Sequence, residues 1–115
     1  DNGDGAIIDV ERFDLEPELP IFHGRLGDIK PEGVRDIPKP KWLEYANKII
    51  GEELLTERMK SSLAEMGKTL KAVPQLGTGA GIAGSAVAYA VRMILTHQAM
   101  ASGKYAISPE HIFHP

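Results

Sequence analysis

The sequence contains no cysteine, and this absence removes three kinds of chemistry. A chain without thiols forms no disulfide, holds no zinc–thiolate centre and has no cysteine nucleophile. Aromatic residues make up only 6%, and they do not interleave with a basic stripe of the kind that binds nucleic acid. The net charge of −3 points the same way, because nucleic-acid-binding domains normally carry a basic excess. We therefore expect no nucleic-acid partner.

Catalytic motifs are missing as well. The sequence has no G-x-S-x-G nucleophile elbow and no Walker phosphate loop. Its first residues, DNGDG, lack the basic and then apolar pattern of a secretory signal, and the lack of cysteine is typical of a cytoplasmic protein. Nothing in the residues supports a catalytic group in this chain, so whether it belongs to an enzyme stays open.

Charge is absent from one long stretch, between Lys71 and Arg92. Within Val73–Gln98 the apolar residues recur at helical spacing from Ile82 onward, which predicts a helix that begins near 79–84 and ends near Gln98. Such a small, apolar helix is expected to be buried on nearly all sides, and its glycines should let another backbone come close. The segment approaches membrane-spanning length, but its glycines, hydroxyl residues and Pro74 favour a helix outside a membrane.

The remaining elements are short. Residues 1–40 predict an extended strand and loop part with one strand at Ala6–Val10, residues 41–98 a helical part, and residues 99–115 a short strand and tail. The helical part holds two amphipathic helices, at Lys41–Ile50 and Glu52–Met66, before the long one; the last strand is expected at Lys104–Ile107, with a helical turn from Ser108. These elements define an α+β fold, as a single domain or as a C-terminal fragment of an α/β protein.

The glycines Gly79, Gly81 and Gly84 spell G-x-G-x-x-G and are weak candidates for cofactor binding. A dinucleotide site needs a strand directly before the first glycine and an acidic residue about twenty positions later. Pro74 interrupts the preceding segment, and the only acid downstream is Glu110. Close helix packing is therefore the favoured explanation, with a dinucleotide-binding protein as a third hypothesis.

Acidic residues recur every two or three positions from Asp9 to Glu18, which predicts a solvated face rather than a cation site. The DNGDG turn does not fit an EF-hand loop, whose twelfth position needs Glu where this chain has Arg12. We expect no metal ion here.

Four histidines are candidates for chemistry. His23 lies beside Arg25, and the two could contact an anion or a partner, with a structural hydrogen bond as the alternative. His97 suits the end of the long helix, where the helix dipole stabilises a cationic imidazolium. His111 and His114 could share a helical face, but without a carboxylate partner they make a poor metal site.

Residues 67–108 resemble the C-terminal part of the ThiF/MoeB/HesA proteins, the bacterial relatives of ubiquitin-activating E1 enzymes. The resemblance consists of a Pro-containing approach, a Gly- and Ala-rich helix, an Arg near its end and Ser-Gly before a short strand. The matching residues are Pro74, Gly77, Gly81, Arg92, Ser102, Gly103 and Tyr105. The stretch Val10–Pro17 fits more loosely.

The resemblance implies ATP-dependent adenylation of a carboxyl group, often the C-terminus of a sulfur-carrier protein, with ATP and magnesium as cofactors. It also implies a central sheet and a homodimer. The family's nucleotide loop, its ATP- and magnesium-binding residues and its cysteines are absent from this chain, so the resemblance implies a C-terminal structural and dimerisation part that is not catalytic alone. The alternative is a freestanding protein-binding or assembly module without enzymatic activity.

Overall fold

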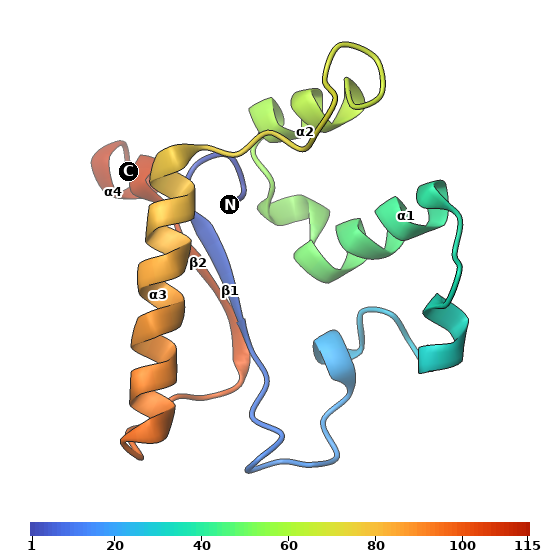
Figure 1. Cartoon of the computed structure of the whole chain (residues 1–115). Coiled ribbons are helices and arrows are strands. Elements are labelled where there is room, and N and C mark those ends of the chain that lie inside the picture. Colours follow the sequence, from blue (N-terminus) through green and yellow to red (C-terminus); the bar gives the residue numbers. More distant parts are fainter.

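The computed structural model describes the backbone of residues 1–115 and the side chains of all but Pro31. Two groups of elements lie on opposite sides of the molecule (Figure 1). One contains strands β1 (Ala6–Val10) and β2 (Gly103–Ile107) with helices α3 (Gly77–Leu95) and α4 (Pro109–Phe113), and the other contains α1 (Lys39–Ile50) and α2 (Glu57–Ala64). Three short 3-10 helices complete the order: η1 (Ile21–Gly24), η2 (Pro31–Val34) and η3 (Glu52–Leu54). The α+β class expected from the sequence is confirmed.

The sheet consists of β1 and β2, which pair antiparallel from Ala6↔Ile107 to Val10↔Gly103. Successive side chains of a strand point to opposite faces, so Ala6, Ile8 and Val10 share one face. All three are buried, and they form the core together with residues of α3, the following loop and β2: Ile82, Ala83, Ala86, Met100 and Ile107. Asp9 lies on the opposite face, a placement that matters for the site described below.

The long helix α3 approaches the N-terminal backbone at Gly79, as the sequence predicts. A Cβ atom at this position would lie 2.8 Å from both the Gly5 carbonyl oxygen and a carboxylate oxygen of Asp1. Such distances are too short for a real side chain, so glycine is required here by packing. The helix begins at Gly77 and ends at Leu95, slightly earlier than expected at both ends.

The expectation that this helix is buried on nearly all sides is wrong for this chain. Gly79 and Ala90 are its buried residues, and most of its other side chains are exposed. The physical reason is the width of the sheet. Two strands about 4.8 Å apart cannot cover a helix that is about 10 Å across with its side chains. One stripe of α3 therefore rests on β1 while the others face outward.

The second amphipathic helix is shorter than predicted. Residues 52–66 divide into η3 and α2, because Leu55 and Thr56 adopt extended backbone conformations between them. The Thr56 hydroxyl accepts a hydrogen bond from the Met59 N–H at 3.1 Å and thus caps the first turn of α2. Threonine is a preferred N-cap residue, so this local bond starts a new helix where periodicity alone suggested a continuous one.

The N-terminal turn, residues 1–5, is hydrogen-bonded to three separate helical segments. The Asp1 carboxylate accepts the Leu76 N–H at the start of α3, and the buried Asn2 side chain donates to the Leu54 carbonyl of η3 at 2.9 Å. The Asp4 carboxylate accepts the Glu110 N–H of α4 at 3.0 Å. Short polar side chains of this turn therefore fix where each helical segment begins or ends.

The molecule is flat and open. Its extents are 46 × 43 × 21 Å and its radius of gyration is 15.8 Å, whereas a compact domain of this length has about 13 Å. Its accessible surface is 8282 Å², against about 6,200 Å² for a compact monomer of this mass. The excess of about 2,000 Å² exceeds the surface that one partner buries in a standard protein–protein interface, about 800 Å².

Candidate functional site

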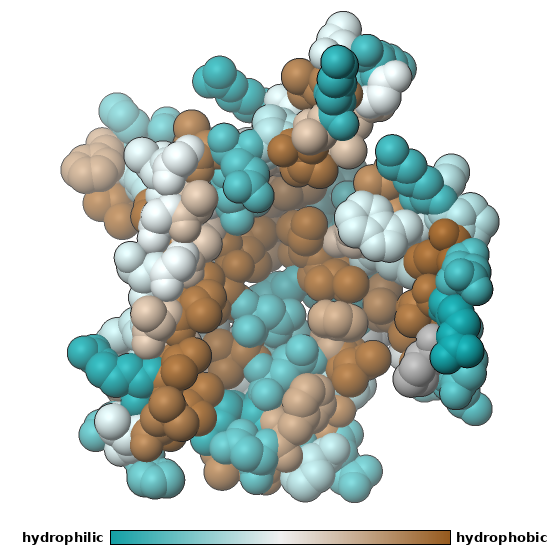
Figure 2. Space-filling model, in the orientation of Figure 1, coloured by the Kyte–Doolittle hydropathy of each residue, from teal (hydrophilic) through white to brown (hydrophobic). Residues whose placement is uncertain are grey.

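An exposed apolar row of residues runs along α3, at the helical spacings of four, three, four and four. We call it the α3 stripe; it consists of Ala80, Gly84, Val87, Val91 and Leu95. The side chains of Val87, Val91 and Leu95 are 50%, 49% and 72% exposed. Figure 2 shows apolar surface along the lower half of this helix and in the hollowed middle of the molecule. Large apolar patches of this kind usually mark a binding surface.

Open apolar grooves flank α3 on both sides. On the β2 side a groove of about 830 Å³ lies between the helix, with Ile82 and Tyr89, and the sheet, with Ile107. On the β1 side a smaller groove of about 190 Å³ is lined by Val87 and Val91 of the stripe and by Ile8 and Val10 of β1. The grooves lie where further strands or another helix would extend the layer, so α3 and the sheet can accept a covering element on either flank.

By length and apolar composition α3 could also cross a membrane, and only 11% of its apolar stretch is buried within this chain. The core helix of a soluble protein passes the same criterion, so this observation does not distinguish the two environments.

The G-x-G-x-x-G stretch lacks the structural context of a dinucleotide-binding loop. Residues 71–76, which precede α3, are loop and bend, so Gly79 does not follow a strand and the condition for a dinucleotide-binding protein is not met. An added Cβ at Gly81 or Gly84 would meet nothing within 4 Å, and both positions face open space. This open space allows a ligand to approach, so what counts against a dinucleotide is the absence of a strand directly before Gly79.

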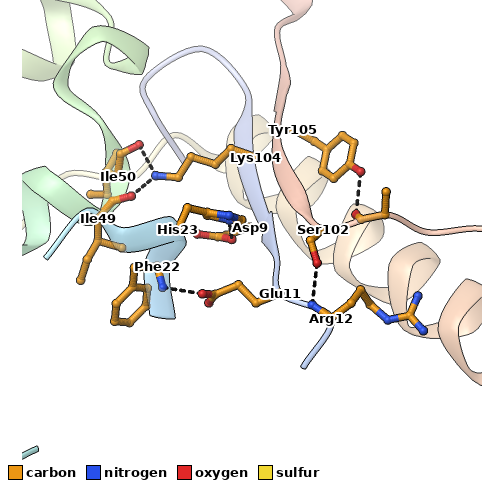
Figure 3. Close-up of polar contacts among 11 residues, drawn as sticks. Asp9, Glu11, Arg12, Phe22, His23, Ile49, Ile50, Ser102, Lys104 and Tyr105 are labelled. Atoms are coloured by element: carbon orange, nitrogen blue, oxygen red, sulfur yellow. Dashed lines mark hydrogen bonds and ion pairs between the residues drawn. The ribbon is translucent and has the colours of Figure 1, made fainter. Parts of the chain in front are cut away.

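Two residues that carry the E1-like resemblance after α3, Ser102 and Tyr105, form hydrogen bonds with nearby backbone groups. The Ser102 hydroxyl accepts the Arg12 N–H at 2.8 Å, and the Tyr105 hydroxyl donates to the Ala101 carbonyl at 2.7 Å (Figure 3). The Arg12 guanidinium also donates to the Met100 carbonyl at 2.7 Å. These bonds fix the turn between α3 and β2 against the end of β1. The matched residues that make them therefore have a structural role.

Arg12 is held in a bidentate pair with Asp14, with nitrogen–oxygen distances of 2.8 and 2.7 Å. The hydrogen bond from the guanidinium lowers the pKa of Asp14, and the same bond raises the pKa of Arg12. Together with the bond to the Met100 carbonyl, the pair gives each nitrogen of this guanidinium a hydrogen-bond acceptor, and the Arg12 side chain is 10% exposed.

A second polar cluster lies on the face of β1 opposite the core. Nε2 of His23 is 2.5 Å from a carboxylate oxygen of Asp9, and the carboxylate of Glu11 accepts the Phe22 N–H (Figure 3). Phe22 and His23 have left-handed backbone conformations, with φ of 50° and 55°, which turn η1 back onto the strand. One ligand atom from each of Asp9, Glu11 and His23 lies within 4.8 Å of the other two.

The acidic pattern predicted that Asp9 and Glu11 belong to a solvated face, and it gave no connection between them and His23. The signal that was available is their spacing: residues i and i+2 of a strand share a face. No sequence signal indicated the left-handed turn that brings His23 there.

Arg25 does not join this cluster. It lies 3.3 Å from Glu53, so His23 and Arg25 each face a different carboxylate. The Arg25 hydrogen bond and charge help to lower the pKa of Glu53, after the larger contribution of that residue's own backbone N–H.

Lys104, opposite Asp9 in the sheet register, connects the sheet to the other side of the molecule. Its ammonium donates to the carbonyls of Ile49 and, at 2.8 Å, Ile50 at the end of α1. Burial lowers the pKa of Lys104 and nearby Arg25 lowers it further, while Asp9 and other acids act in the opposite direction. A cation is well placed at these carbonyls because they form the negative end of the α1 dipole.

The other histidines lie elsewhere. His97 follows the end of α3 with a left-handed φ of 58°, whereas His111 is in α4 and His114 follows it. Among the described residues, the cluster of potential metal ligands includes none of these three.

Comparison with known proteins finds similarity to a mycobacterial protein. No family model matches the chain, and no solved structure matches it. The chain is 34% identical over 104 residues to the uncharacterized protein MT1398 of Mycobacterium tuberculosis (strain CDC 1551 / Oshkosh). The match covers 90% of this chain but 14% of the relative, so this chain spans about one seventh of that protein's length.

Proposed function

We propose that this chain is the C-terminal structural and dimerisation part of an E1-like (ThiF/MoeB/HesA) ATP-dependent adenylyltransferase and is not catalytic alone. The observation that carries the proposal is the α3 stripe, in the segment that resembles this family. A helix with Val87, Val91 and Leu95 exposed is more stable when another protein surface covers it.

The open sheet supports the same role. β1 and β2 form a two-stranded sheet, and such a sheet is marginal without further strands or a covering layer. The family resemblance implies a larger central sheet, and the flanking grooves lie where that sheet would continue. In the mycobacterial relative, the matched region is likewise joined to a much longer chain.

The partners follow from this arrangement. The α3 stripe and its grooves would contact the nucleotide-binding half of the same protein or a second copy in a homodimer. ATP and magnesium would be bound by that half, because the nucleotide loop and the ATP- and magnesium-binding residues of the family are absent from this chain. The substrate implied by the family is a carboxyl group, often that of a sulfur-carrier-like protein, and the location implied is cytoplasmic.

The alternative is a freestanding protein-binding or assembly module. It would use the same α3 stripe for another protein and would have no connection with adenylation. The excess surface fits either hypothesis, so the two must be distinguished by activity.

The deciding experiment compares the intact mass of the purified protein with its encoded reading frame and then measures ATP–pyrophosphate exchange by the product of that frame. A longer product that catalyses carboxylate-dependent exchange supports the adenylyltransferase, and removal of residues 1–115 from it should abolish both exchange and dimer formation. A frame that ends with this chain, or a longer product without exchange, would favour the freestanding module.

A further inference from the structure

We propose that Asp9, Glu11 and His23 form a binding site for a divalent transition-metal cation of the Zn²⁺ or Mn²⁺ type. This site does not depend on the adenylyltransferase proposal, because it uses none of the residues of the α3 stripe, although Asp9 and Glu11 also line the small groove between β1 and that stripe. The inference depends on the donor set, its geometry and the local charge.

The geometry fits a shared ion. Zinc binds imidazole nitrogen and carboxylate oxygen at about 2.0–2.2 Å, so two ligand atoms of one ion lie at most about 4.4 Å apart. The three donors lie within 4.8 Å of one another, and the His23–Asp9 contact is 2.5 Å. Small side-chain rotations would open that contact and let all three donors bind one ion.

The three ligands come from two chain segments that the fold holds together. Asp9 lies in β1 and Glu11 directly follows the strand, at a spacing of two that favours the same face, and the left-handed turn of η1 places His23 beside them. Asp9 and His23 have side chains that are 25% and 28% exposed, so the cluster is partly shielded and still open to an ion from solvent.

The local charge favours a cation. The nearest ammonium, Lys104, donates its hydrogen bonds to the Ile49 and Ile50 carbonyls and forms no salt bridge with either carboxylate among the described side chains. Two carboxylates and a neutral imidazole carry a charge of −2, and Lys104 reduces the local sum to −1. A divalent ion would relieve the repulsion between the carboxylates on one strand face.

The donor types select the class of ion. Imidazole suits zinc and other late transition metals, whereas carboxylates suit manganese and magnesium, so one imidazole with two carboxylates favours Zn²⁺ or Mn²⁺ over Ca²⁺. Three protein ligands also leave positions for water, as in catalytic rather than structural zinc sites.

The test is isothermal titration of the metal-free chain with Zn²⁺ and with Mn²⁺. We expect one site per chain. Because loss of an outer-shell partner alone weakens metal sites about 10–100-fold, removal of a direct ligand should weaken this one at least about tenfold. The ligand variants are His23→Asn, Asp9→Asn and Glu11→Gln. Asparagine suits position 23 because it tolerates the left-handed backbone.

The matched controls are His97→Asn, which changes a histidine of the same backbone class, and Asp14→Asn, which changes an acid in the same stretch. Circular dichroism of each variant establishes that the fold is kept. Binding that falls with the three ligand variants and not with the controls supports the site. Binding that is absent for both metals, or that His23→Asn leaves unchanged, would overturn it, as would loss confined to a His111→Ala and His114→Ala double variant.

Discussion

Replacing the three large residues of the α3 stripe with serine should weaken association of this chain without unfolding it. Fully burying a Val or Leu side chain contributes about 1.5–3 kcal/mol. The side chains of Val87, Val91 and Leu95 have about half, half and three quarters of their surface still exposed. Covering them therefore contributes about 3 kcal/mol per subunit, which corresponds to a change in Kd of at least about 100-fold.

Serine is suitable because its intrinsic helix propensity is close to that of valine, so α3 itself should persist. The assay is sedimentation velocity over a dilution series of the wild-type chain and of the triple variant, with circular dichroism to confirm helix content. The matched control replaces Leu15 and Ile112, both 67% exposed and outside α3, with serine.

We expect the wild-type chain to associate, the triple variant to be monomeric at concentrations at which the wild type is not, and the control to resemble the wild type. A wild-type chain that stays monomeric to about 1 mM, with the same sedimentation as the triple variant, would refute the argument that the stripe holds two copies of this chain together. Equal weakening by the control would show that general surface hydrophobicity drives association.

Three further predictions concern the scaffold. Asn2→Ala leaves the buried Gly5 N–H without its side-chain acceptor and should reduce the free energy of unfolding in urea by about 1–3 kcal/mol, whereas no change would contradict the assigned bonds. Gly79→Ala places a Cβ 2.8 Å from the Gly5 carbonyl oxygen, so its melting temperature should fall; Gly84→Ala, which meets nothing within 4 Å, should not lower it. Glu44 has a pKa lowered from 4.5, first by the hydrogen bond from Lys48 at 3.0 Å, so its contribution to stability is present above about pH 4.5 and lost as the pH falls through the lowered value. In Glu44→Gln the free energy of unfolding should therefore fall less steeply as the pH is lowered. An unchanged acid dependence would show that the Glu44–Lys48 pair does not contribute to it.

The local elements were accessible from the sequence because local interactions define them. A short stretch with two isoleucines and a valine after a run of turn formers gives β1 at Ala6–Val10, and the apolar spacing with Gly51 at the end gives α1 to within two residues. The division of the second helix was missed although Thr56 offered a cap, because helical periodicity continues through both parts. Of the three glycines expected to allow close packing, Gly79 lies against another backbone, whereas Gly81 and Gly84 face open space.

The surroundings of α3 were not accessible from the sequence. An apolar run indicates that a helix tends to be covered, but it does not say whether the covering atoms belong to the same chain. Here β1 covers one stripe, and Val87, Val91 and Leu95 remain exposed. The inference from composition to burial was therefore wrong for this chain, although it remains informative about the need for a partner surface.

The polar cluster on β1 could be predicted only in part. The spacing of Asp9 and Glu11 places both carboxylates on one face of a strand, but His23 is twelve or more positions further along and reaches them through a non-glycine left-handed turn. Positive φ is uncommon for residues other than glycine, and although histidine adopts it more often than most, nothing specific in the sequence indicates it at Phe22 and His23. Contacts that depend on such a turn are visible only in the folded chain.

The bonds of the N-terminal turn also have a consequence for the order in which the chain folds. They join residues separated by 52 positions for Asn2 and Leu54, and by 106 for Asp4 and Glu110. Closing loops of this length opposes folding entropically, and proteins rich in distant contacts fold slowly. We expect α1, α2 and α3 to form early as separate helices and the N-terminal turn to join them late. The first five residues would then control the rate at which the native arrangement is reached.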